Sequence, residues 1–205
     1  MRLLIKGGKL FDPAHGRLGQ EGDLYVAGGR IVSQLVQTDR VIPASGLAVM
    51  PAGIDLRAGI AAYGRNYCRL WGALPPVAEV ARTYLRLGYT HVHEPGATLE
   101  TVAYVHRELA ALPGLDTSSS LTLNLRDFDL WLQNPDRLAA VAEAWRYYRA
   151  ASRALNLRLV EPFVHYPQEF YRHRCLNLPR AVAILAELAQ QLGERLTLET
   201  LPELL

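Results

Sequence analysis

The chain has 205 residues, half of them hydrophobic and a fifth charged, so it can bury a substantial core and is not disordered by composition. Its 22 basic and 20 acidic residues give a formal net charge of +2, too even a balance for a nucleic-acid-binding surface, and its two cysteines are too few for a disulfide framework. No apolar run is long enough to cross a membrane, so we expect a soluble cytoplasmic protein with no signal peptide and no nucleic-acid or membrane partner.

Residues 1–50 are predicted to form a small antiparallel β unit. Short apolar runs alternate there with turns, and Gly28-Gly29 separates two of the runs, which is typical of a tight hairpin. A phosphate-binding loop is excluded at these glycines because no helix follows them. Fifty residues of sheet bury too little surface to be stable alone, so the unit is expected to pack against something else. The expected strands are residues 2–5, 10–11, 23–26, 31–36, 41–42 and 47–50.

From residue 51 the pattern changes to strands that alternate with helices, which predicts a parallel sheet covered by helices. The helical stretches begin near prolines or capping residues such as Thr98 and Asn134. Strands are expected near 52–56, 90–94, 120–125, 157–161 and 196–200, and helices near 77–87, 99–112, 136–155 and 180–192. We therefore predict an α/β fold, with a small β-sandwich-like unit over residues 1–50. An incomplete, about five-stranded TIM-barrel-like β/α domain is predicted over residues 51–205.

Five parallel strands cannot close a barrel, which takes eight. The predicted sheet therefore has two edge strands, whose unpaired backbone groups invite pairing unless they are covered. Its inward face is expected to be open and apolar. A second copy of the chain, a partner protein, or local collapse into an open sheet would each cover these surfaces. The first two would make the chain an obligate component of an assembly.

The N-terminal motifs resemble those of the metal-dependent amidohydrolase superfamily. Stretches 3–8, 12–13, 23–26, 29–31 and 45–55 carry this resemblance, and the last looks like the join between the small β-sandwich and the first barrel strand. Within the superfamily the chain is most similar to the A-type, catalytic-like subunit of formylmethanofuran dehydrogenase, a type that also occurs in the bacterial formyltransferase/hydrolase complex. Parts of 60–69, 88–109, 157–162 and 179–193 carry that finer resemblance. It covers essentially the whole chain but only about the first third to two fifths of a full-length protein of this type, and it implies a place in one-carbon metabolism.

The resemblance implies a metal-activated water, yet the positions it assigns to metal ligands do not carry the family's ligands. Arg57 and Gly59 stand where the family has the two histidines of Asp-x-His-x-His. Arg158 stands at the position of the bridging carboxylated lysine, and Glu199 and Leu201 stand where imidazoles are expected. The family's last ligand, an aspartate on strand eight, would lie beyond the end of this sequence. Because a guanidinium has no lone pair to offer, these vestigial positions predict no catalytic residue and no cofactor.

Two alternatives stay open at these residues. A relocated metal site at His91, His93 and Glu94 is the first, because the two histidines of an H-x-H strand point to one face. It would make the chain a metal-dependent hydrolase of N-formyl or cyclic amides that uses zinc. The second is a small-molecule-binding protein with a methanofuran-like or pterin-like ligand, whose carboxylates pair with Arg57 and Arg158.

Both guanidinium groups are also expected at the C-terminal ends of neighbouring strands. A cation there would replace the positive charge of the family's metal and hold the surrounding polar side chains in place.

The other polar and aromatic residues have ordinary structural interpretations. The acid pair Asp127 and Asp129 is expected in a cap or turn. The histidines outside the strands are expected to be solvated or at an interface, and the thiols to be unreactive: His165, His173, Cys68 and Cys175. The role of four aromatic residues, in the core or at an interface, stays open: Trp131, Trp145, Tyr147 and Tyr148.

The favoured function is a catalytically inactive, amidohydrolase-like subunit with a structural or regulatory role. It would belong to a formylmethanofuran-processing complex, and its partners would be a second copy of the chain or the other subunits.

Overall fold

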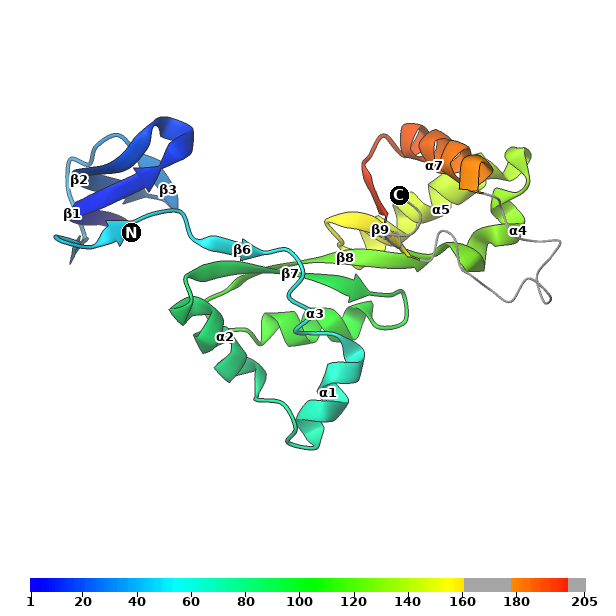
Figure 1. Ribbon diagram of the computed structural model, residues 1–205, viewed down its shortest axis with the longest axis horizontal. Coiled ribbons are helices and arrows are strands. Elements are labelled where there is room, and N and C mark those ends of the chain that lie inside the picture. The colour runs from blue at the N-terminus through cyan, green and yellow to red at the C-terminus, as the bar shows by residue number, and fades with distance from the viewer. Residues whose placement is uncertain (161–177, 199–205) are drawn as a thin grey trace. The chain divides into compact units, whose positions relative to one another are not determined.

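The computed structural model describes residues 1–160 and 178–198 (Figure 1). The chain divides into two compact units, Met1–Ala52 and Gly53–Leu205, and each unit contains one five-stranded sheet. We call these sheets A and B. Among the described residues, no helix has both the length and the apolar character that crossing a bilayer requires.

Sheet A, in the first unit, has the strand order β3-β2-β1-β4, and β5 also pairs with β1. Its strands are β1 (Arg2–Asp12), β2 (Arg17–Ala27), β3 (Arg30–Val32), β4 (Arg40–Pro43) and β5 (Ala48–Val49). Gly28 and Gly29 form the turn of the β2–β3 hairpin, both at positive φ, a backbone conformation that glycine adopts without steric cost.

The pairing in sheet A corrects the expectation of a purely antiparallel unit. The β1–β2 and β2–β3 pairs are antiparallel, but β4 and β5 both run parallel to β1. Parallel strands need a long crossover connection, and the β2–β3 hairpin together with the segment after it supplies one between β1 and β4.

Sheet A buries little apolar surface. In residues 1–52, all of which the structure describes, Leu10 and Ala44 are the only buried apolar side chains. Several larger apolar side chains of this unit are exposed instead: Leu18, Ile31, Val36, Val41, Leu47 and Met50. The first unit therefore has a small core of its own and a large share of uncovered apolar surface.

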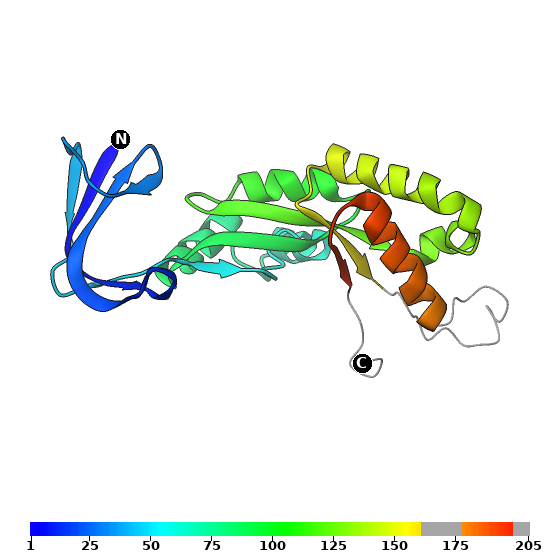
Figure 2. The same cartoon turned by 90° about the horizontal axis from the view of Figure 1, so that it is seen from above.

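Sheet B, in the second unit, is entirely parallel and has the strand order β10-β9-β8-β7-β6. Its strands are β6 (Gly53–Asp55), β7 (Tyr89–Ala97), β8 (Asp116–Asn124), β9 (Asn156–Val160) and β10 (Leu196–Leu198). The described helices are α1 (Tyr63–Leu70), α2 (Val77–Arg86), α3 (Val102–Ala110), α4 (Asp129–Leu132), α5 (Leu138–Ser152) and α7 (Leu178–Leu192). The sheet is curled and its helices lie along the outer side (Figures 1 and 2). This arrangement confirms the predicted α/β fold with an incomplete barrel.

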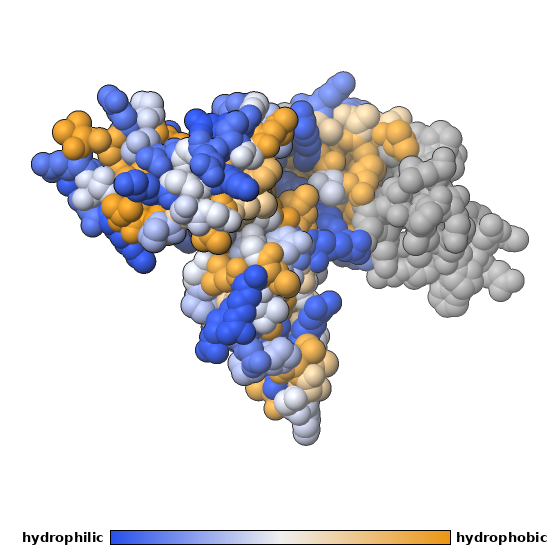
Figure 3. Space-filling view, turned by 60° about the vertical axis from the view of Figure 1, so that its left-hand side comes forward, coloured by the Kyte–Doolittle hydropathy of each residue, from blue (hydrophilic) through white to orange (hydrophobic). Residues whose placement is uncertain are grey.

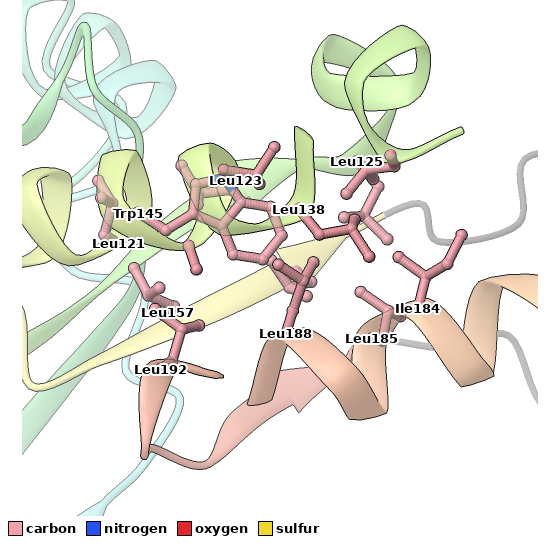
Figure 4. Packing of buried hydrophobic residues seen from close by; sticks show 14 of the residues in the cluster. Leu121, Leu123, Leu125, Leu138, Trp145, Leu157, Ile184, Leu185, Leu188 and Leu192 are labelled. Carbon is pink, nitrogen blue, oxygen red and sulfur yellow. The ribbon is translucent and has the colours of Figure 1, made fainter. Parts of the chain in front are cut away.

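Two apolar clusters join the helices to the outer face of sheet B. In the first, Val92 of β7 is fully buried among side chains of α2 and α3. In the second, Leu121 of β8 and Leu157 of β9 pack against α5 and α7, with Trp145 of α5 between them (Figure 4). Phe128 meets Trp145 edge to face, with ring centroids 5.4 Å apart. These strand residues alternate with polar ones, so the apolar side chains all point to the helix-covered face.

The four aromatic residues whose role the sequence left open divide between core and surface. Trp145 is fully buried in the second cluster, and Tyr148 packs against that cluster while partly buried. Trp131 and Tyr147 are exposed. Two of the four aromatic residues therefore contribute to the core.

The remaining candidate residues have peripheral places. Asp127 is exposed in the 3₁₀ turn Leu125–Phe128 that links β8 to α4, and Asp129 begins α4. Cys68 is an exposed free thiol on α1. The others lie outside the described residues: His165, His173 and Cys175.

Candidate functional site

The concave face of sheet B, opposite the helix-covered face, is lined mainly by polar side chains. Strand pairing places His93 beside Ser118, Ser120 beside Asn156, and Arg158 beside Thr197. This corrects the expectation of an open, apolar inward face. The physical reason is that alternate residues of β8 and β9 are polar, and a strand presents alternate residues to opposite faces.

Hydrogen bonds connect β7 to β8 through two histidines and two serines. His91 Nε2 and His93 Nδ1 each lie 2.8 Å from Ser118 Oγ. His93 Nε2 lies 2.7 Å from Ser120 Oγ. The two histidines of the H-x-H motif therefore share one face of β7, as the sequence predicts, and one serine lies between their rings.

The same line of hydrogen bonds continues over β9 to β10. Ser120 donates to Asn156 Oδ1, and Asn156 Nδ2 donates to Thr197 Oγ1 at 2.8 Å. Five hydrogen bonds thus join four neighbouring strands. We call the six side chains the polar ladder: His91, Ser118, His93, Ser120, Asn156 and Thr197.

The far end of the polar ladder fixes where its protons lie. Asn156 Oδ1 can only accept, so Ser120 donates its single proton there and must accept from His93 Nε2–H. When His93 is neutral, its Nδ1 carries a lone pair and accepts the proton of Ser118. Ser118 in turn accepts from His91 Nε2–H. Both ring nitrogens of His93 are therefore engaged within the ladder.

The environment of His93 favours its neutral form. The imidazole is buried, and desolvation is the main cause that lowers its pKa. The neighbouring His91 and Arg158 lower the pKa of His93 further, because both favour the uncharged ring. The proton arrangement derived for the neutral ring is thus the one expected near neutral pH.

Glu94 points away from the concave face and is almost fully buried, with 1% of its surface exposed. Its carboxylate accepts hydrogen bonds from the backbone N–H of Ala61 at 2.8 Å and of Gly96 at 3.1 Å. These contacts hold the segment after β6 against β7. Glu94 therefore does not share a ligand set with His91 and His93. Within the described ranges, no group of three or more His, Cys, Asp and Glu side chains could hold a metal ion.

Two of the vestigial metal positions lie in the loop after β6. Arg57 is an exposed residue, and its backbone N–H donates to Asp55 Oδ1 at 2.9 Å. Gly59 has a φ of +57° and presents no side chain. The positions expected on the last strand, Glu199 and Leu201, lie outside the described residues.

The third vestigial position, Arg158, reaches across the concave face. Arg158 starts on β9 and its Nη1 donates to the carbonyl of Pro95 on β7 at 3.2 Å, a reach of two strand spacings, or roughly 10 Å. Thr122 of the intervening strand donates to the same carbonyl at 2.6 Å. The guanidinium thus lies over the sheet rather than in bulk solvent.

The expected placement of Arg57 and Arg158 on neighbouring strands is wrong. The strands β7 and β8 lie between β6 and β9, and Arg158 is in the middle of its strand. The two arginines nevertheless line one hollow of about 400 Å³ on the concave face. Its other described lining residues are His93, Ser120, Asn156 and Thr197 of the ladder, with Leu56, Pro95, Leu155 and Leu198.

A divalent metal ion does not fit the donors of this hollow. The guanidinium groups of Arg57 and Arg158 carry positive charge and no lone pair, so they repel a metal cation. His93 uses both ring nitrogens within the ladder. The described lining therefore contains no carboxylate and a single imidazole, whose two nitrogens are already hydrogen-bonded, too few donors to bind such an ion.

Two curated proteins share sequence with the chain. It is 27% identical over 139 residues to protein FwdA of Methanocaldococcus jannaschii. It is 29% identical over 177 residues to FhcA, one of the subunits of the formyltransferase/hydrolase complex Fhc of Methylorubrum extorquens. These alignments include 58% and 76% of this chain but only 24% and 32% of the relatives, so the chain spans about a quarter to a third of their length. No protein-family model matches the chain.

Solved structures share its fold. The crystal structure of the formyltransferase/hydrolase complex FhcABCD from Methylorubrum extorquens with methylofuran matches with a TM-score of 0.81 and 22% identity, over 97% of this chain and 42% of that chain. Phenylurea hydrolase B matches with a TM-score of 0.61 and 15% identity, over 98% of this chain and 55% of that one. A Xaa-Pro dipeptidase matches with a TM-score of 0.56 and 13% identity, over 97% and 56%.

Proposed function

We propose, from the premise that this chain is an amidohydrolase-superfamily member related to FwdA and FhcA, that it is a non-catalytic component of a formyltransferase/hydrolase-type complex. Its role there is structural or regulatory, and its partners are the other subunits of that complex. The similarity to FhcA, a subunit of such a complex, supports the assembly part of the proposal.

The non-catalytic part rests on one observation: two arginines line the hollow, at positions that the sequence resemblance assigns to metal ligands. A metal-activated water needs lone-pair donors around the metal, whereas Arg57 and Arg158 supply N–H donors and a fixed positive charge. The polar ladder also engages His93 through both ring nitrogens.

Exposed apolar side chains support a role within an assembly. Leu70 and Trp71, at the C-terminal end of α1, are 82% and 84% exposed. Apolar surface is visible at the lower end of Figure 3, which corresponds to the α1 region of Figure 1. Clustered exposed apolar residues of this kind often mark protein–protein contact surfaces.

Purification of the tagged chain from its native cells tests the assembly part. We expect formyltransferase/hydrolase-type subunits to co-elute and to be identified by mass spectrometry, while an unrelated tagged cytosolic protein serves as the control. A chain that elutes alone as a well-dispersed monomer in light scattering contradicts it.

Zinc content and hydrolysis of an N-formyl amine test the non-catalytic part. We expect the purified chain to retain no stoichiometric zinc after dialysis and to show no turnover when Zn²⁺ is added. One tightly held zinc ion per chain, together with zinc-dependent turnover, contradicts this part of the proposal.

A further inference from the structure

We infer that the hollow on the concave face binds a small molecule that carries carboxylate groups, with Arg57 and Arg158 as the recognition groups. Such binding goes beyond the proposed function, because it is a property of the chain alone and does not depend on its partners.

The charges around the hollow favour an anion. Among the described lining residues only Arg57 and Arg158 are permanently charged, and both are cationic. Guanidinium groups form strong, often bidentate hydrogen bonds with carboxylates. Neither arginine has to be unpaired for this, because each guanidinium carries five N–H donors and can serve several oxygen atoms at once.

The floor of the hollow is polar and adds a hydrogen-bond donor without adding negative charge. Thr197 accepts from Asn156, which leaves the hydroxyl proton of Thr197 for a further acceptor. The lowered pKa of His93, to which Arg158 contributes, is a separate sign of positive potential at this floor.

The walls and size indicate an organic ligand rather than an inorganic ion. Leu56, Pro95 and Leu155 line the hollow beside the polar ladder, so it can hold an apolar carbon chain as well as a charged group. Its volume of about 400 Å³ falls within the range of small-molecule pockets. A short dicarboxylate matches two cationic groups better than a monocarboxylate does.

Titration of the intact chain with succinate, acetate and acetamide at constant ionic strength tests this inference. We expect both carboxylates to raise the thermal unfolding midpoint, succinate at lower concentration than acetate. Both should also shift the NMR signals of the His93 ring. Acetamide has nearly the same shape without the charge and should have neither effect.

Substitution of the arginines decides whether the hollow is the binding site. We expect Arg158→Gln to weaken succinate binding at least tenfold. Arg86→Gln removes the same charge from an exposed position on α2 and should leave the affinity unchanged. If Arg158→Gln does not fold, Arg57→Gln in the exposed loop takes its place and should also weaken binding.

Equal effects of acetate and acetamide, or wild-type succinate affinity in the arginine variants, would overturn the inference. The result is separable from that of the proposed function. Carboxylate binding by a chain that recruits no subunits overturns only the assembly proposal, and recruitment by a chain that binds no carboxylate overturns only this inference.

Discussion

The two faces of sheet B consist of the same five strands but are held by different interactions. On the outer face, leucine and valine side chains of the strands pack against helix residues such as Trp145 and exclude water. On the concave face, a line of hydrogen bonds joins β7 to β10 beside two arginines. The difference shows that the outer packing can maintain the barrel-like scaffold while the inner face changes its chemistry. Residues of the concave face can therefore differ without loss of the fold.

The largest expected effect is on the outer face. Leu159→Ala removes a fully buried side chain and should lower the free energy of unfolding by about 3–4 kcal/mol, because a cavity is left between β9 and the helices. Thr122→Val, on the concave face, should cost about 1 kcal/mol for the lost hydrogen bond to Pro95. Urea unfolding measures both. Equal losses of unfolding free energy in the two variants would contradict the proposed difference between the faces.

A smaller loss is expected at Glu94, the buried carboxylate of the outer face. Glu94→Gln replaces one accepting oxygen by an NH₂ group, which cannot accept from the N–H of Ala61 or Gly96, and should cost about 2 kcal/mol. Hydrogen exchange at the Ala61 amide should accelerate more than exchange at amides of α5. Unchanged protection of Ala61 would show that the carboxylate does not hold this segment.

The polar ladder should contribute less than the packed face. Ser120→Ala leaves His93 Nε2–H and Asn156 Oδ1 without their partner and should lower the free energy of unfolding by about 1–2 kcal/mol. Imidazole NMR signals of His93 should change, while those of His106, which contacts the Ser152 carbonyl, should not. Unaltered His93 signals in the Ser120→Ala variant would contradict the hydrogen bonds of the polar ladder.

The smallest effect is a dependence on pH that belongs to the concave face. The pKa of His93 is lowered in the folded chain, mainly by burial, so the unfolded chain takes up a proton first as the pH falls. Stability from this group is fully present above the unfolded pKa of about 6.5 and is lost as the pH falls toward the folded value. His93→Gln should therefore make the thermal unfolding midpoint depend less on pH between pH 7 and 5 than it does in the wild type. The same dependence of the midpoint on pH in the wild type and the variant would exclude His93 as its cause.

The outer face was predictable because apolar periodicity and helix start signals agree there. The expected strand near 157–161 and helix near 77–87 correspond to β9 and α2 within about a residue. Helix α1 was missed, since Gly64 lies inside it and no capping side chain precedes it. Strands β1 and β2 are longer than expected, because their pairing continues through polar residues such as Lys9 and Glu21.

The candidate site was predictable only in part. The shared face of His91 and His93 follows from the two-residue period of a strand, and the same period places Glu94 on the opposite face. The serines of β8 carried no family motif, although the alternation from Ser118 to Asn124 signals one polar face. That His93 meets Ser118 depends on strand register, which no local pattern specifies.

The polar ladder has a direction as well as a composition. With both rings neutral, each side chain donates to the next one in the order from His91 to Thr197, although the step from Ser118 to His93 runs back from β8 to β7. Its β7 end presents a lone pair at His91 Nδ1, and its β10 end presents the Thr197 hydroxyl proton. A half-turn of the His93 ring about its Cβ–Cγ bond would put ring carbons where the two nitrogens lie and break both hydrogen bonds, so the ladder favours one ring orientation.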